Sequence, residues 1–264
     1  MIAEEKVKKN QKKSFLKTIS NVKIGWGVLI ALAVEITILS ILSPYFLKPE
    51  NIFNILRSIS VIGVVSIGMT MLIISGGLDL SVGAVVGLSG MVTGALMTRM
   101  GLPTAIAVLG GLAIGAVIGL TNGLLVTKLK INALIVTLGM LSIGRGLTYA
   151  ISKGSNIFVK SSPGIIYLGR GYVGKVPFSA IIMLILIIVG SFFLSYTVFG
   201  RHIYAVGGNE RASRLAGIQV NKVRLIVFII TSVLAAFAGL ISSGMLSSAE
   251  ISAGTGLELD VIAA

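Results

Sequence analysis

The sequence contains no cysteine, a single histidine, His202, and only nine acidic residues among its 264 positions. The lack of cysteine excludes disulfides, thiolate metal sites and cysteine nucleophiles, and one histidine excludes a His-rich catalytic or zinc site. Charged residues make up 12% of the chain, about half of the roughly 25% found in soluble domains. A soluble enzyme of ordinary type, a disordered chain and a nucleic-acid-binding domain are therefore excluded.

What the chain has in abundance is apolar sequence: 55% of its residues are hydrophobic, and 33 are glycine. Its mean hydropathy is +1.01. A membrane-spanning helix needs about 20 apolar residues to cross the hydrocarbon core. Segments that approach or reach this length occupy residues 24–42, 52–75, 80–98, 104–127, 132–152, 177–198 and 223–246. They predict an all-α polytopic membrane protein, a bundle of about seven transmembrane helices.

The N-terminal stretch 1–23 is basic, with lysines at 6, 8, 9, 12, 13, 17 and 23. Ser43-Pro44-Tyr45-Phe46 follows the first apolar segment in place of a small-residue cleavage site, so we expect an uncleaved span. With the N-terminus in the cytoplasm, the inner segments carry more lysine and arginine than the outer ones, as the positive-inside rule requires. We expect a basic cytoplasmic tail over 1–23 and a membrane domain over 24–264.

Small residues repeat at helical spacing in several spans. Gly111, Gly115, Gly119 and Gly123 recur every four residues in the 104–127 segment. Because lipid provides no hydrophobic drive for helix association, small residues on one face allow helix backbones to approach closely. We predict that these four glycines are helix-packing positions rather than a binding site.

One motif resembles a nucleotide site but lacks its context. Residues 169–174, Gly-Arg-Gly-Tyr-Val-Gly, match the dinucleotide fingerprint, and Lys175 extends the match toward a P-loop. Val176 and Pro177 replace the Ser or Thr that would hold magnesium, and no βαβ unit surrounds the motif. We expect a flexible outer loop here, no bound cofactor or metal, and no ATP site in this chain.

Charged residues within or beside apolar spans are costly in lipid and are often functional. Glu35 lies in the middle of the first span, and Arg145 lies in the fifth. Arg145 has three possible environments: a pair with Glu35, a pair with Asp79, or a polar cavity. Asp79 lies in Ser75–Ser81, which is either a tight inner turn or a helix broken inside the membrane. Its carboxylate can cap a helix that begins at Leu80 by accepting from the amide of Ser81 or Val82.

The inner segment 199–224 has the start and stop signals of a short helix. The pair Gly207-Gly208 breaks the chain, Asn209 is a good N-cap, Glu210 suits the first turn, and Gly217 ends the helix. Ala212, Leu215 and Ala216 form a small apolar stripe along about two turns. The residues alone leave two interpretations open: a loop that anchors to anionic headgroups through its arginines, or a docking helix for a soluble partner.

Three long motifs carry a resemblance to a known family: SGGLDLSVGAVVGLSG (75–90), GRHIYAVGGNERASRLAGIQVNKVR (200–224) and LSSAEISAGTGLELDVIAA (246–264). Together they resemble the sugar-permease subunits of bacterial ATP-binding cassette (ABC) importers, and most closely those for ribose. The resemblance implies a permease homodimer in the inner membrane, translocating a monosaccharide. A separate cytoplasmic ATPase subunit would drive it, and an extracytoplasmic sugar-binding protein would deliver the sugar.

The same resemblance assigns roles to residues. The loop Gly207–Gly217 is expected to contain the coupling helix that docks into the ATPase subunit. The coupling positions are Gly207, Gly208, Asn209, Glu210, Arg211, Leu215 and Gly217, although Arg211 stands where the family often has a small residue. The segment Gly76–Gly83 is expected to lie near the translocation path. The path candidates are Glu35, Asp79, Ser81 and Arg145. Family members usually continue with further spans beyond the motif at which this sequence ends.

Other classes stay open at this stage. An ion-coupled transporter is expected to have acidic or histidine relays within its spans, and this chain offers only Glu35 and Asp79. A membrane-embedded enzyme is expected to have clustered catalytic groups, and the sequence shows none. Within the importer class, the cargo is another simple sugar or autoinducer-2 if it is not ribose.

Overall fold

The computed structural model describes residues 25–159 and 162–264, and the chain divides into two units, residues 1–52 and 53–264. The predicted basic tail, 1–23, lies outside the described residues. In the first unit, helix α2 (Gly25–Leu42) is apolar, and its side chains from Gly27 onward are mostly exposed. Helix α3 (Pro49–Ile74) begins in this unit with proline in its first turn, where a missing N–H breaks no helical hydrogen bond.

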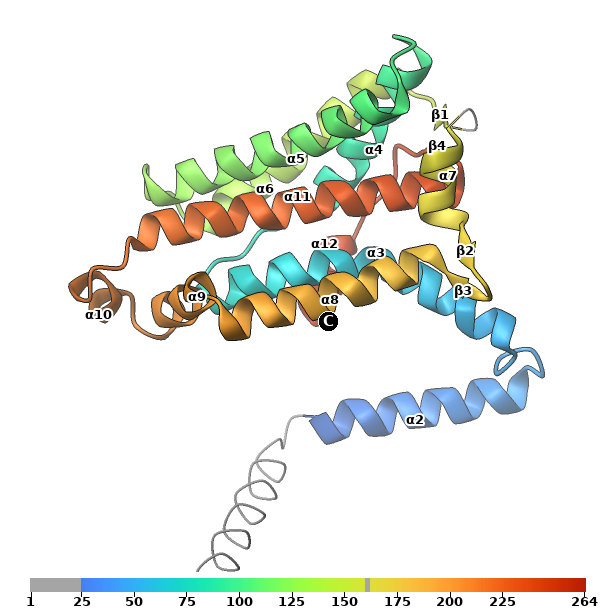
Figure 1. The fold of residues 1–264 in the computed structure, drawn as a ribbon, viewed down its shortest axis with the longest axis horizontal. Coiled ribbons are helices and arrows are strands. Elements are labelled where there is room, and N and C mark those ends of the chain that lie inside the picture. The colour runs from blue at the N-terminus through green and yellow to red at the C-terminus, as the bar shows by residue number, and fades with distance from the viewer. Residues whose placement is uncertain (1–24, 160–161) are drawn as a thin grey trace, which may run out of the picture. The chain divides into compact units, whose positions relative to one another are not determined.

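The second unit contains the rest of α3 and a bundle of further helices (Figure 1). They are α4 (Val82–Thr98), α5 (Thr104–Thr127), α6 (Ala133–Ser152), α7 (Pro163–Arg170), α8 (Phe178–Tyr196), α9 (Val198–Gly208), α10 (Glu210–Leu215), α11 (Val220–Leu246) and α12 (Leu257–Ala263). Two short antiparallel pairs complete the fold. Strand β1 (Ile157–Phe158) pairs with β4 (Ser248–Ala249), and β2 (Tyr172–Val173) pairs with β3 (Val176–Pro177).

Every apolar segment predicted to span the membrane forms a helix, and the described residues confirm an all-α polytopic membrane protein. By length and composition, five of the described helices can cross a membrane: α3, α5, α6, α8 and α11. Helices α2 and α4 are apolar but shorter. Predicted and observed bounds coincide for the 104–127 span, because Pro103 precedes its first turn and Lys128 caps its end.

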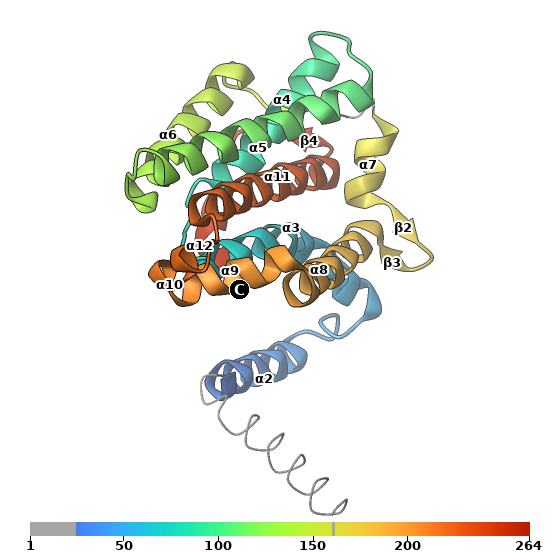
Figure 2. The ribbon, with the colours of Figure 1, turned by 60° about the vertical axis from the view of Figure 1, so that its left-hand side comes forward.

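Helix α11 forms the centre of the second unit, and in both views it lies between α5 and α3 (Figure 1, Figure 2). Glycine faces bring its neighbours close. A Cβ on Gly115 would approach the Ala236 Cβ at 2.5 Å and the Ser232 carbonyl oxygen at 2.6 Å, and one on Gly119 would lie 2.7 Å from the Ile229 Cα. On the other side, the Thr231 hydroxyl donates to the Gly68 carbonyl of α3 at 2.9 Å.

The four glycines of α5 share one face but not one partner. Gly115, Gly119 and Gly123 lie against α11, whereas Gly111 lies against Thr93 and Ser89 of α4. All four are buried. The regular spacing therefore produces a three-helix contact among α4, α5 and α11.

The C-terminal segment after β4 turns back along α4. A Cβ on Gly87 would lie 2.8 Å from the Ala253 carbonyl oxygen. Gly254 packs on Gly83, nearer the start of α4. The Gly83/Gly87 face thus contacts this returning segment, and at Gly87 it also contacts the Arg145 guanidinium of α6.

Candidate functional site

The connection between α8 and α11 lies at one end of the bundle, which we call the α10 end. It contains two helices where the sequence predicted one. Thr197 begins α9 by accepting a hydrogen bond from the Gly200 amide at 3.0 Å, and α9 then runs through Gly208. The expectation that Gly207-Gly208 breaks the chain is therefore wrong by one residue. The break falls at Asn209, whose extended backbone separates α9 from α10.

Helix α10 has the caps that the sequence predicted. The Asn209 side chain accepts from the Ala212 amide at 2.9 Å, which identifies it as the N-cap. After the C-cap residue Ala216, Gly217 has a φ of +82°, a left-handed conformation that favours glycine. The helix is six residues long.

The apolar stripe of α10 points away from the rest of the protein. Leu215 is 86% exposed, Ala212 and Ala216 are also exposed, and Ser213 is the residue that this helix buries. Arg211 is exposed as well. A leucine held in this way packs little against the described residues, so the stripe is available to an external surface.

Glu210 connects α10 to its surroundings electrostatically. Its carboxylate forms ion pairs with Arg214 at 2.7 Å, one turn along α10, and with Arg224 of α11 at 2.8 Å. The hydrogen bond from Arg214, together with the charge of Arg224, holds the pKa of Glu210 below its ordinary value. Glu210 is therefore ionised at neutral pH.

The α9–α10 region also contacts the segment between α3 and α4. A Cβ on Gly207 would collide with the Ile74 carbonyl oxygen at the end of α3, so only glycine permits this approach. Arg224 donates from its Nε to the Ser75 carbonyl oxygen at 3.2 Å. No sequence pattern indicated these contacts, because the residues lie far apart along the chain.

The segment 75–81 is a turn that joins two separate helices. Gly76 has a φ of +79°, and Ser75, Asp79 and Ser81 are fully buried. The Asp79 carboxylate accepts from the Ser81 amide at 2.8 Å, as predicted, and from the Ser81 hydroxyl at 2.6 Å. The predicted helix start at Leu80 is wrong: α4 begins at Val82, with Ser81 as its N-cap. Asn122 of α5 donates to the Ser81 hydroxyl at 3.0 Å.

Arg145 pairs with neither of the predicted carboxylates among the contacts of the described residues. Its guanidinium donates to the Ala253 carbonyl of the returning C-terminal segment at 2.6 Å, and it interacts electrostatically with the Glu258 carboxylate. Sequence reasoning missed Ala253 and Glu258, because nothing in the sequence indicated that this segment folds back. Glu35, in the first unit, is exposed on α2.

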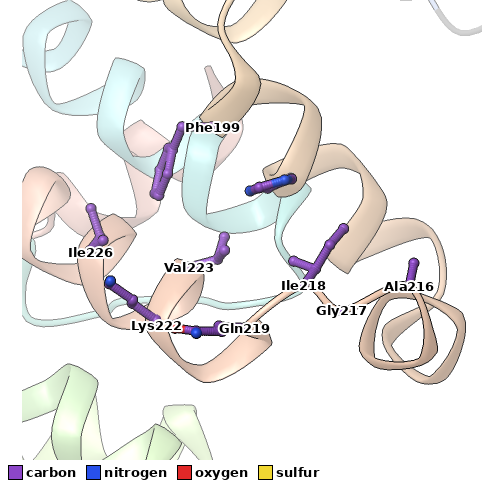
Figure 3. Close-up of a pocket in the computed structure, with 9 residues that line it drawn as sticks. Phe199, Ala216, Gly217, Ile218, Gln219, Lys222, Val223 and Ile226 are labelled. Carbon is purple, nitrogen blue, oxygen red and sulfur yellow. The ribbon is translucent and has the colours of Figure 1, made fainter.

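Several pockets of the described residues lie at the α10 end. One of about 420 Å³ is lined by Phe199 of α9, by Gly217 and Ile218, and by Val223 and Ile226 of α11 (Figure 3). A second, of about 580 Å³, has the charged lining residues Lys130, Glu210, Arg214 and Arg224. A third, of about 330 Å³, is lined by Gly76, Asn132 and Arg224, among others. Arg224 lines both the second and the third.

The segment that matches the dinucleotide fingerprint is a helix followed by a hairpin. Residues 163–170 form α7, and Gly174, with a φ of +63°, lies in the turn between β2 and β3. Where a flexible loop was expected, the segment thus forms a short helix and a two-stranded hairpin. Gly169 packs directly on Gly244 and Met245 of α11. Within the described residues, no group of three or more His, Cys, Asp or Glu side chains is placed to hold a metal ion.

Membrane-length helices packed through glycine faces, with a capped helix exposed between two of them, define a polytopic membrane protein. Residues 51–264 match the family described as the permease component of branched-chain amino acid transport systems. The chain belongs to this permease family, and its resemblance to ABC sugar importer permeases is confirmed.

Individual relatives cover most of the chain. The sequence is 42% identical to the ribose import permease of Escherichia coli K12 over 239 residues, which are 89% of this chain and 74% of that protein. It is 40% identical to the ribose import permease of Bacillus subtilis 168 over 239 residues, 90% of this chain and 74% of that protein. A probable ABC transporter permease of E. coli K12 is 35% identical over 238 residues, 90% of this chain and 71% of that protein. No solved structure matches the chain.

Proposed function

We propose that this chain is the membrane permease subunit of an ABC importer that carries ribose across the bacterial inner membrane. The observation that carries the proposal is 42% identity to a ribose import permease over 89% of the chain. Relatives from two different bacteria, Escherichia coli K12 and Bacillus subtilis 168, are ribose import permeases. The polytopic helical fold, with polar groups such as Asp79 buried at the α10 end, is consistent with it.

We also propose that ATP hydrolysis occurs on a separate cytoplasmic subunit, which docks on α10. Exposure of Leu215, Ala212 and Ala216 beside charged Arg211 supports this choice, because an apolar stripe with a charged rim suits a protein interface. Docking there requires the α10 end to be cytoplasmic, and we propose a cytoplasmic N-terminus as well, from the lysines of the segment 1–23. An extracytoplasmic sugar-binding protein and a second copy of the permease complete the proposed assembly.

For the translocation path, the candidates remain Glu35, Asp79, Ser81 and Arg145. Support is strongest for Arg145, which is half-buried in α6 and reaches across the glycine face of α4 to the returning segment. Asp79 and Ser81 are supported by their burial in the turn beside α5. Glu35 is a candidate by its position in α2 alone.

The docking proposal is tested by co-purification of the detergent-solubilised chain with the ATPase subunit encoded beside it. Leu215→Gln should sharply reduce recovery of the ATPase, because it removes the apolar group at the centre of the exposed stripe. Leu129→Gln is the matched control, since Leu129 is 65% exposed at the same end but lies outside α10. Equal ATPase recovery with both variants would place the docking site elsewhere.

A further inference from the structure

Arg224 occupies a junction between the exposed helix α10 and the buried turn 75–81. From the second turn of α11, its guanidinium reaches Glu210 of α10 at 2.8 Å through one terminal nitrogen. Through Nε it reaches the Ser75 carbonyl oxygen at 3.2 Å. Its side chain is 23% exposed, less than the 40% of Glu210. One side chain thus holds two elements that are distant in sequence.

This bridge depends on the shape of arginine. A guanidinium presents several N–H donors in a fixed planar fork, so it can satisfy a carboxylate and a carbonyl in different directions at the same time. A lysine ammonium is a single point charge on a flexible stem, and it has no second donor nitrogen to reach the other partner. The charge of Arg224 alone therefore does not account for the geometry.

Beyond Ser75, the connection continues into the bundle. The turn that carries Ser75 also carries Asp79, which binds the amide and hydroxyl of Ser81. Ser81 in turn accepts from Asn122 of α5. A displacement of Arg224 therefore acts on a turn whose buried polar groups are bonded to a membrane-length helix.

A steric contact runs beside the bridge. Gly207, at the end of α9, lies against the Ile74 carbonyl so closely that no side chain fits there. This contact keeps the end of α9 next to the end of α3, but it is steric and cannot draw the two ends along together. The Glu210–Arg224–Ser75 bridge is the bonded route from α10 to the turn in the contacts of the described residues.

From this juxtaposition we propose that Arg224 is a positioning residue that transmits movement of α10 to the turn 75–81. The proposal rests on the proposed function, because it takes α10 as the element that the ATPase moves. Binding at α10 shifts Glu210, Arg224 follows its ion-pair partner, and the Ser75 carbonyl follows Arg224. The residue acts in coupling rather than in docking or in contact with sugar.

Hydrogen exchange on the complex with the ATPase subunit tests this transmission. In the unaltered chain, ATPase binding should protect amides of 207–217 and also change exchange of amides in 75–82. In Arg224→Gln, protection of 207–217 should persist, whereas the response of 75–82 should fall by roughly two- to thirtyfold, the range seen for residues in coupling networks. Arg224→Lys should give an intermediate response, because it keeps the charge but has one donor nitrogen.

Lys222→Gln is the matched control, because Lys222 is a cation on the same helix that lines the neighbouring pocket. It should leave both responses unchanged. A full response of 75–82 in Arg224→Gln would overturn the proposal, and so would loss of protection at 207–217 in that variant alone, which would make Arg224 a docking residue. Ribose uptake by the unaltered complex reports separately on the proposed function, so the two can fail independently.

Discussion

Asn209 shows how a single side chain sets the position of α10. Its carboxamide oxygen accepts from the Ala212 amide at 2.9 Å, and its extended backbone ends α9. Asparagine is among the preferred N-cap residues because its side chain satisfies an amide that the first turn leaves unpaired. Its role was therefore predictable from residue type and context.

Replacing Asn209 with alanine should loosen α10 without unfolding the bundle. Loss of an N-cap typically costs about 1 kcal/mol, which is roughly a fivefold increase in local opening. Hydrogen exchange of amides 211–215 should accelerate accordingly. Asn132→Ala is the control, because Asn132 caps α6 by accepting from the Leu134 amide at 2.8 Å. Equal exchange at 211–215 in wild type and Asn209→Ala would contradict the capping role.

Glu210 makes the order of α10 depend on pH in a defined direction. The hydrogen bond from Arg214 and the charge of Arg224 lower the pKa of Glu210 in the folded protein. A group with a depressed folded pKa contributes fully above its unfolded value, and the contribution is lost as pH falls through the folded value. Exchange of amides 211–215, corrected for intrinsic rates, should thus be constant from about pH 6 to 8 and increase only below the ordinary glutamate range of about 4.3.

Glu210→Gln provides the comparison for this titration. The variant has no carboxylate at the position, so its exchange at 211–215 should be faster at neutral pH and should lack the acid-dependent step. A transition near neutral pH in the unaltered chain would contradict the assigned ion pairs.

The bridge made by Arg224 was beyond the reach of sequence reasoning. Arg224 was identifiable only as one of several cations in a predicted inner loop. Its Nε contact with Ser75 joins residues 149 positions apart, and no local pattern encodes such a pairing. The same holds for Arg145 and Ala253, 108 positions apart.

Among the elements, the glycine face of α5 has the most specific structural consequence. The four-residue spacing predicted close helix packing but could not identify the partner, because any apolar helix satisfies the pattern. The structure shows α11 against Gly115, Gly119 and Gly123, and α4 against Gly111. The returning C-terminal segment was missed for a related reason. Its glycines belong to a recognisable motif, but the motif does not indicate that the segment folds back along α4.

Gly115→Ala should destabilise this helix contact. The added Cβ would lie 2.5 Å from the Ala236 Cβ and 2.6 Å from the Ser232 carbonyl, and overpacking of this kind costs about 1–3 kcal/mol. The apparent melting temperature in detergent should fall. Gly139→Ala in α6 is the control, because its Cβ would meet no described atom within 4 Å. A melting temperature that is unchanged by Gly115→Ala would contradict the prediction, because it would mean that α5 and α11 can move apart without loss of stability.

At the scale of the molecule, apolar segment length predicted the helices well. Hydrocarbon thickness imposes a length that survives as a plain sequence signal. The two-helix form of the α8–α11 connection was harder to predict, because α9 is short and its glycines resemble chain breaks. Hydropathy and residue spacing do not identify the partners or the transported substrate. These are inferred from similarity to named relatives.

The measurement that tests the central claim most directly is uptake of labelled ribose into proteoliposomes. These would contain this chain, its neighbouring ATPase subunit and the matching sugar-binding protein, with ATP on the ATPase side. Labelled leucine is the paired substrate, because the family description names branched-chain amino acids. We expect ATP-dependent uptake of ribose and none of leucine. Uptake of leucine in place of ribose, or ribose uptake that needs no ATP, would contradict the assignment as an ABC ribose permease.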